Sequence, residues 1–167
     1  MIQPQIYILS AKQGEGKTMR CLELVNQLKS KGESVGGIIA PGFWENNIRS
    51  GFDLMDIQDS KNIPFAQRGF IEGWQKTKAF YFNPEAIEKG EIILRKAIQE
   101  NDWIVLDEIG KLDIQGYLWS TVFSELISIM NKKWIICVRD IFVEEVIQNW
   151  KLKKVHVLQI NEDLFYS

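Results

Sequence analysis

Short apolar runs and amphipathic segments alternate along the chain. The runs are continuous rather than interrupted at every second position, and this pattern is typical of strands that are buried on both faces of a sheet. They lie at residues 5–9, 34–40, 103–106, 133–138 and 155–160. The alternation predicts an α/β fold of three layers, in which helices cover both faces of a mainly parallel sheet and ligands bind beyond the carboxyl ends of the strands.

Helical spacing of apolar residues recurs in four segments between and after these runs. The four apolar faces are Cys21, Leu24, Val25 and Leu28; Ile87, Gly90, Leu94 and Ala97; Trp119, Val122, Phe123, Leu126, Ile127 and Met130; and Val143, Val146, Ile147 and Trp150. Asn83 followed by Pro84 predicts the start of the second helix. Gly32 predicts a left-handed end for the first helix.

The region between the second and third strands interrupts the alternation. Asn46 and Asn47 tolerate positive φ and predict a hairpin turn within residues 43–49, with a return strand at 51–57. Residues 58–82 show no clear period, so we expect a long surface segment with one short strand. A loop of this length usually has a functional role.

The composition fits one globular domain that covers residues 1–167, since 46% of the residues are hydrophobic and 25% are charged. A net charge of −2, with both signs mixed along the chain, argues against nucleic acid or an anionic membrane as a partner, and the sequence does not point to a protein partner. The N-terminus lacks the pattern of a targeting peptide. Cys21 and Cys137 lack metal-ligand spacing. These features predict a cytoplasmic enzyme.

One glycine-rich segment lies between the first strand and the first helix. It matches the phosphate-loop pattern G-x-x-x-x-G-K-[ST], with alanine in the first position as the looser form of the pattern allows. The segment consists of Ala11, Lys12, Gln13, Gly14, Glu15, Gly16, Lys17 and Thr18. Its glycines let consecutive backbone amides face one concavity, to which the helix N-terminus adds positive potential. We expect this loop to bind a nucleoside triphosphate, with the catalytic Lys17 ammonium group on the β- and γ-phosphates.

An acidic pair follows the third apolar strand. Asp107 and Glu108 come directly after that strand, and a parallel sheet would bring them to the edge where the phosphate loop opens. We expect Mg²⁺ as the cofactor, held by the Thr18 hydroxyl group and the Asp107 carboxylate. Glu108 is the candidate general base for the water that attacks the γ-phosphate. An acidic residue that only caps a following helix is the alternative interpretation, and the phosphate loop favours the functional one.

The charge that builds up on the transferred phosphoryl group calls for one more cation. Arg49, Lys111 and Arg139 are candidates, and Arg139 is the best placed because it directly follows the strand at 133–138. An arginine that merely begins a solvated helix would show the same pattern. His156 lies alone inside a strand and is interpreted as structural. Three aromatic residues are candidates for stacking on a nucleobase, although half-buried core aromatics are commoner: Phe43, Trp44 and Trp74.

With both motifs placed, the chain resembles the thermostable nucleoside-triphosphatase family of P-loop NTPases. The likeness is clearest up to about residue 113, and it rests on the phosphate loop, residues 107–111, the hairpin segment 42–52 and residues 81–83. The resemblance implies a strand order of 5-1-4-3-2 with an inserted β-hairpin after the second strand. It also implies the use of ATP, GTP and other nucleoside triphosphates, and slow Mg²⁺-dependent release of the γ-phosphate. The chain departs from the family at Ala11 and at Met19, where a second threonine is common.

Two other functions are compatible with these motifs, because a fold does not define a reaction. A nucleotide or small-molecule kinase would pass the γ-phosphate to an acceptor, with residues 58–82 as a lid or acceptor site. A regulatory switch would order that segment in response to the bound triphosphate, for a partner to recognise. Glu108 beside Asp107 suits the activation of water, which favours hydrolysis.

Overall fold

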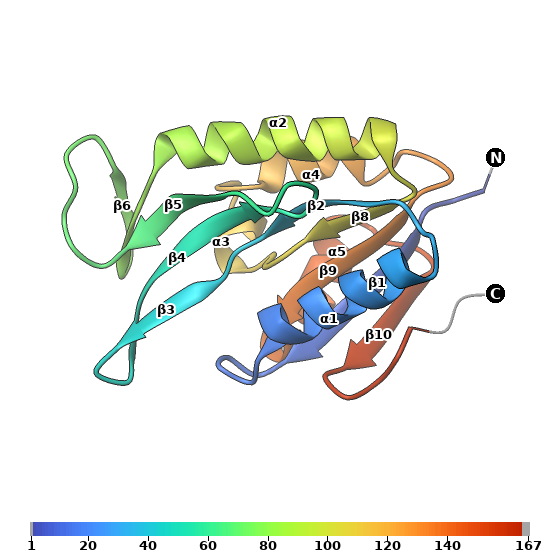
Figure 1. The fold of residues 1–167 in the computed structure, drawn as a ribbon, viewed down its shortest axis with the longest axis horizontal. Helices are drawn as coiled ribbons and strands as arrows, with labels where there is room; N and C mark the ends of the chain where they lie inside the picture. Colours follow the sequence, from blue (N-terminus) through green and yellow to red (C-terminus); the bar gives the residue numbers. More distant parts are fainter. Residues whose placement is uncertain (1, 165–167) are drawn as a thin grey trace.

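The computed structural model describes residues 2–164. Strands and helices alternate at both ends of the chain, and this alternation agrees with the predicted α/β fold (Figure 1). A block of consecutive strands lies between the two ends. In chain order the elements are β1 (Gln5–Ala11), α1 (Lys17–Ser30), β2 (Val35–Ile39), β3 (Gly42–Glu45), β4 (Ile48–Asp56), β5 (Asn62–Gln67), β6 (Gln75–Thr77), β7 (Phe80–Phe82), α2 (Pro84–Glu100), β8 (Trp103–Leu106), α3 (Lys111–Ile114), α4 (Ser120–Leu126), β9 (Lys133–Arg139), the 3-10 turn η1 (Asp140–Phe142), α5 (Val143–Asn149) and β10 (Val155–Gln159).

The described strands form one mixed sheet. Its parallel part runs in the order β10-β1-β9-β8-β2, and β4, β5, β7 and β6 extend it beyond β2 by antiparallel pairing, while β3 pairs with β4. Because β9 lies between β1 and β8, Ala11 is in register with Arg139, and Leu106 is in register with Ile136. The loop after β1 and the residues after β8 therefore lie at the same edge of the sheet.

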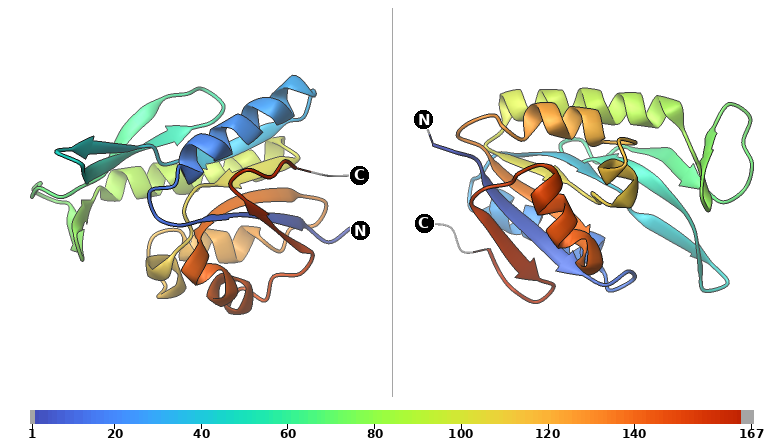
Figure 2. Two further views of the ribbon diagram at one scale, coloured as in Figure 1. Left: turned by 90° about the horizontal axis from the view of Figure 1, so that it is seen from below. Right: turned by 180° about the vertical axis from the view of Figure 1, so that it is seen from behind.

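Helices cover both faces of this sheet and produce two hydrophobic cores (Figure 2). α1 packs Cys21, Leu24, Val25 and Leu28 against one face. α2, α4 and α5 bury apolar residues on the other face. Helices cover the central strands on both sides. The sequences of these strands are therefore continuously apolar and do not alternate between apolar and polar residues.

Local signals in the sequence place several element ends correctly. The Asn83 side chain accepts a hydrogen bond of 3.1 Å from the Glu85 amide and so caps α2, with Pro84 in its first turn. Asn46 and Asn47 have φ values of 50° and 62° in the turn between β3 and β4. Capping and positive φ depend on residues close in sequence, so they can be predicted without knowledge of the tertiary structure.

The prediction of a largely irregular segment over residues 58–82 is wrong, because β5, β6 and β7 all lie within it. β6 and β7 have three residues each, which is too short to show a period. Pro64 interrupts the pattern in β5. The buried residues Phe65 and Phe82 belong to the core beneath α2, so tertiary packing rather than local propensity determines these strands.

The third predicted helix is shorter than its apolar stripe suggests. α4 ends at Leu126, and Met130 lies beyond it and is exposed. A separate turn of helix, α3, precedes α4 and was not predicted. Gly116 and Leu118 have φ values of 95° and 49° between the two, and these left-handed residues interrupt the helical path.

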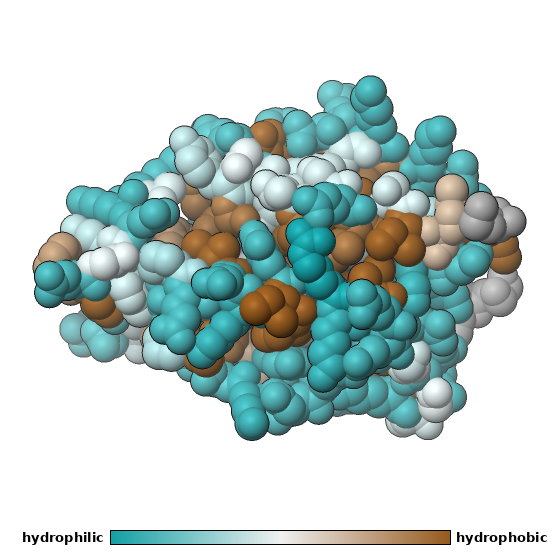
Figure 3. Space-filling view, turned by 90° about the horizontal axis from the view of Figure 1, so that it is seen from above, coloured by the Kyte–Doolittle hydropathy of each residue, from teal (hydrophilic) through white to brown (hydrophobic). Residues whose placement is uncertain are grey.

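The face of the molecule that α2 covers is mainly hydrophilic, with apolar side chains in small separate groups (Figure 3). Ile92 is one exposed apolar residue of α2. This distribution fits a helix that covers the core with one side and faces water with the other. Within residues 2–164, no helix combines the length and the apolar character that a membrane crossing requires.

Candidate active site

The phosphate loop joins the end of β1 to the start of α1. Gly14 and Gly16 have φ values of 82° and 88°, a left-handed conformation that glycine adopts without strain. In the described part of the chain, no side chain caps the N-terminus of α1, and the first turn of this helix contains no acidic residue. The free amides and the positive potential of this helix end are therefore available to an anion.

Lys17 and Thr18 begin α1 at the centre of the site. The Lys17 side chain is buried, and its Nζ atom donates to the carbonyl oxygens of Ala11 at 3.3 Å and Lys12 at 3.2 Å. The Thr18 hydroxyl group donates to Oδ2 of Asp107 at 2.8 Å. The fold thus brings residues of the two separate sequence motifs into direct contact.

Hydrogen bonds hold the Asp107 carboxylate from three directions. Its Oδ2 atom accepts from the Ala40 amide at 3.0 Å as well as from the Thr18 hydroxyl group, and the Cys137 thiol is a third partner. Burial raises the pKa of Asp107, because charge is disfavoured away from water. These hydrogen bonds and the charge of Lys17 act in the opposite direction. A metal cation beside Asp107 would favour its ionised form.

The oxygen atoms of Thr18 and Asp107 fit a bound Mg²⁺ ion. Oγ1 of Thr18 and Oδ2 of Asp107 are 2.8 Å apart. Neighbouring ligands of an octahedral Mg²⁺ ion lie about 2.9 Å apart when its bonds are 2.0–2.1 Å long. Because Mg²⁺ keeps several of its waters in protein sites, two protein oxygens and the substrate phosphates suffice to hold it.

Glu108 has a strained backbone conformation. Its φ of 68° lies in the left-handed region, which is unfavourable for a residue with a Cβ atom. Backbone hydrogen bonds fix the chain on both sides of it: the Asp107 amide donates to the Ile38 carbonyl at 3.1 Å, and the Ile109 amide donates to the Cys137 carbonyl at 3.0 Å. The neighbouring strands β2 and β9 therefore hold the turn that presents Glu108.

The carboxyl group of Glu108 has a raised pKa. The residue as a whole is exposed, but its carboxyl group lies in a crowded cleft, and the loss of hydration there is the main cause. The charge of Asp107 raises the pKa further, while the charges of Lys17, Arg49 and Arg139 lower it. A raised pKa makes this carboxylate a better proton acceptor than an ordinary glutamate.

The phosphate loop and Glu108 line one cavity of about 230 Å³, and Arg49 lies in its wall. The Arg49 guanidinium group lies 4.4 Å from the centre of the Trp44 ring and 4.9 Å from that of Phe52. Its Nε atom is buried and has no hydrogen-bond partner among residues 2–164. A Cβ atom on Gly42 would come too close to the guanidinium group, so the Arg49 side chain would have to shift. The inserted hairpin thus supplies a cation to the site.

The other two candidate cations lie outside this cavity. Arg139 ends β9 in register with Ala11, but it is not among the described residues of the cavity wall, and its guanidinium group lies 5.9 Å from the Phe142 ring. Lys111 lines a different cavity on the other side of Glu108. Arg49 is therefore the candidate that shares the cavity with the phosphate loop.

The aromatic candidates are also separated. Trp44 lines the phosphate-loop cavity, whereas Phe43 lines a groove on the outer part of the hairpin. Trp74 is half-buried in the turn before β6. His156 stacks on Tyr7 with ring centres 5.0 Å apart, a contact between neighbouring strands.

Three residues that position the site were not identified by the sequence analysis. They are Ala40, whose amide holds Asp107; Gly42, which accommodates Arg49; and Asp113, which accepts hydrogen bonds of 2.9 Å from the Gly110 and Trp119 amides. A carboxylate three residues after Gly110 is a local signal for Asp113, since acidic residues commonly cap the first turn of a helix. The other two depend on contacts that no local pattern reveals.

We expect Asp113→Asn to remove a pH-dependent part of the stability. Burial raises the pKa of Asp113 to about 7, above the value of about 3.9 in an unfolded chain. The folded state keeps a proton that the unfolded chain releases, so this contribution to stability is present below about pH 4 and is lost as the pH rises through 7. From pH 5 to pH 8, urea denaturation should show that the unmodified protein loses roughly 2–3 kcal/mol more than the variant. Parallel pH curves would contradict this expectation.

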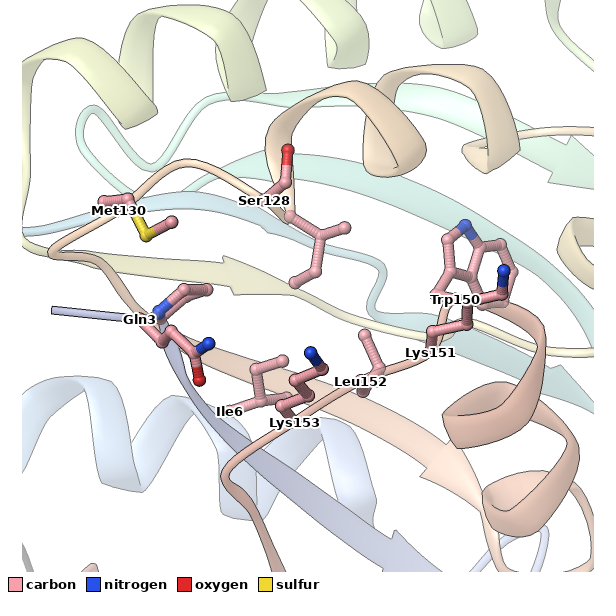
Figure 4. A pocket seen from close by; sticks show the side chains of 10 residues that line it. Gln3, Ile6, Ser128, Met130, Trp150, Lys151, Leu152 and Lys153 are labelled. Atoms are coloured by element: carbon pink, nitrogen blue, oxygen red, sulfur yellow. The ribbon is translucent and has the colours of Figure 1, made fainter. Parts of the chain in front are cut away.

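Another apolar cavity, of about 180 Å³, lies at the opposite end of the sheet (Figure 4). Ile6 at the start of β1, Met130 after α4, and Trp150 and Leu152 after α5 contribute to its wall. The phosphate loop follows the far end of β1, so this cavity is not part of the site described above.

A phosphate loop after the first strand of an α/β sheet, with an acidic pair at the end of another strand, defines a P-loop NTPase. The NTPase family model (NTPase_1) matches residues 6–166. The chain therefore belongs to this family of nucleoside-triphosphatases. Nucleoside-triphosphatase THEP1 of Korarchaeum cryptofilum is 29% identical over 157 residues, which cover 93% of this chain and 72% of the relative. THEP1 of Methanocaldococcus jannaschii is 24% identical over 76% of this chain and 78% of its own length.

Two solved structures share the fold. The solution structure of a human cancer-related nucleoside triphosphatase has a TM-score of 0.70 at 20% identity and covers 93% of this chain and 88% of its own. The crystal structure of THEP1 from Aquifex aeolicus has a TM-score of 0.66 at 18% identity and covers 94% and 89%. At these identities the likeness supports the α/β fold with its mixed sheet.

Proposed function

We propose that this nucleoside-triphosphatase hydrolyses the γ-phosphate of ATP, GTP and other nucleoside triphosphates in a Mg²⁺-dependent reaction within the phosphate-loop cavity. The main support for the proposal is that Lys17, Thr18 and Glu108 line one cavity. The Asp107 carboxylate accepts a hydrogen bond from the Thr18 hydroxyl group beside it. Each of these groups has a separate role in transfer of a phosphoryl group to water.

The loop amides and the Lys17 ammonium group bind the β- and γ-phosphates and orient them. Glu108 accepts a proton from the attacking water, and its raised pKa suits that task. Arg49 provides positive charge for the γ-phosphate oxygens as the bond to the leaving group breaks. Thr18 and Asp107 would hold Mg²⁺, which, when bound, neutralises charge on the phosphate oxygens.

Phosphate release from ATP, GTP, CTP and UTP, with Mg²⁺ and with an excess of chelator, tests this proposal. We expect release from all four nucleotides, because the phosphates rather than the base occupy the loop, and loss of release with the chelator. Release that is equally fast without any divalent cation would contradict the role given to Thr18 and Asp107.

Arg49→Ala is expected to lower turnover by roughly 10–100-fold and to change nucleotide affinity less. The reason is that the guanidinium group stabilises negative charge that develops only during the reaction. Steady-state phosphate release and calorimetric titration with ATP measure the two effects. Arg95→Ala, at an exposed ion pair of α2 with Glu125, is the matched control. A larger loss of turnover in Arg139→Ala would assign the role to Arg139 instead.

A further inference from the structure

A second cavity adjoins the one that holds the phosphate loop. Its volume is about 220 Å³, and it shares Gln13, Phe52 and Glu108 with the first cavity. Glu108 therefore lies between the place for the γ-phosphate and this second space. Hydrolysis by water gives the second cavity no role.

Five aromatic side chains contribute to the wall of this second cavity. Phe65 stacks on Trp119 with ring centres 5.5 Å apart, and it meets Phe82 edge to face at 5.3 Å. Phe52 and Phe80 form a second edge-to-face pair at 5.4 Å. Strands β4, β5 and β7 supply four of these rings, which surround a space suited to an apolar molecule.

The polar groups of the wall are concentrated where the chain passes from β8 into α3. Asp107, Glu108 and Asp113 place three carboxyl groups there, and Lys111 is exposed beside them. Both carboxylate oxygens of Asp113 already accept hydrogen bonds from backbone amides. The Glu108 carboxylate can accept a further hydrogen bond. The Glu108 carboxylate at this end of the cavity disfavours an anionic ligand head and favours a neutral donor.

The volume limits the size of the ligand. A dry cavity of about 150 Å³ can hold benzene. A space of about 220 Å³ therefore accommodates one ring with a short substituent.

We propose that this cavity binds a small apolar alcohol, whose hydroxyl group lies against Glu108 and takes the γ-phosphoryl group in place of water. The inference rests on the proposed binding of a nucleoside triphosphate by the phosphate loop. The alcohol oxygen forms a bond to the γ-phosphorus as its proton moves to Glu108. The bond from the γ-phosphorus to the bridging oxygen breaks, and its electron pair stays on the nucleoside diphosphate. The products are a phosphate monoester and a nucleoside diphosphate.

Simple probes test the proposal with the full chain, ATP and Mg²⁺. Benzyl alcohol and 2-phenylethanol combine a ring with a hydroxyl group, toluene lacks the hydroxyl group, and glycerol lacks the ring. Phosphorus NMR should show ADP with every probe, a new phosphate monoester with the two aromatic alcohols, and inorganic phosphate without such a monoester with toluene and glycerol. Inorganic phosphate and no monoester with every probe would overturn the proposal, and so would inhibition without monoester. Failure to release phosphate from ATP in the absence of probes is a different result, which counts against the proposed hydrolysis itself.

Two variants of the cavity wall locate the binding site. Phe80→Ala removes a half-buried ring of the wall and is expected to lower the monoester yield about tenfold at a fixed alcohol concentration, with hydrolysis changed less than about twofold. Leu118→Trp should reduce the yield by filling the space, which gives an independent test if Phe80→Ala unfolds. Phe70→Ala is the matched control, since Phe70 is 72% exposed and is not among the described residues of the wall. Unchanged monoester yields in folded Phe80→Ala and Leu118→Trp would contradict binding in this cavity.

Discussion

Replacement of Lys17 by alanine is expected to weaken ATP binding and to lower turnover by about 10³-fold. Lys17 is only 8% exposed, and it lies at the N-terminus of α1 between the loop and Thr18. Because the side chain is enclosed, its charge cannot be replaced by a mobile lysine from the surface. Calorimetric titration with ATP and Mg²⁺, together with steady-state phosphate release, measures both effects.

Lys96→Ala is the control for this experiment, because Lys96 is exposed on α2, away from the loop. It removes the same charge from the molecule and should change neither binding nor turnover. Thermal unfolding of both variants checks that they are folded. A folded Lys17→Ala variant with normal ATP affinity would show that the nucleotide binds elsewhere.

Glu108→Gln is expected to keep ATP affinity within a few-fold and to lower turnover by about 10²-fold or more. Glutamine has nearly the same shape as glutamate and can still orient a water molecule, but it cannot accept the proton. The two residues also carry the same cost at the φ of 68°, so the backbone turn should persist. Single-turnover measurements with prebound ATP isolate the chemical step.

The comparison for Glu108 is Glu88→Gln, at an exposed position of α2. This change removes a carboxylate without touching the site and should leave turnover unchanged. If Glu108→Gln hydrolyses ATP as fast as the unmodified protein, Glu108 is not the base. A loss of affinity in place of turnover would instead assign Glu108 to binding.

The parts of the fold that could be predicted are those encoded by neighbouring residues. The buried central strands, the apolar face of α1 around Leu24 and the Asn83 cap of α2 all produce a local pattern. Only one short strand was predicted where β5, β6 and β7 lie, because the burial of Phe65 and Phe82 depends on the distant α2 and β4. Aromatic residues such as Phe65 gave no period that would reveal which side faces the core.

The residues of the candidate site also differ in whether the sequence alone reveals them. Lys17, Thr18 and Asp107 belong to two motifs with a known spatial relation in a parallel sheet, and the structure brings them together. The choice between Arg49 and Arg139 required the path of the hairpin, which the sequence leaves open. Gly42 was unrecognised for the same reason, because the space it leaves is filled by a residue from the opposite strand of the hairpin.

The proposed role of Arg49 predicts how the activity responds to dilution. Arg49, which lines the phosphate-loop cavity, belongs to the chain's own β-hairpin, and its guanidinium group lies close to Gly42. An arginine supplied by a second molecule would be lost when the two molecules separate, and the rate per molecule would then fall as the protein concentration falls. Because the proposed cation belongs to the same chain, we expect each molecule to act alone and phosphate release to stay proportional to protein concentration over a wide range.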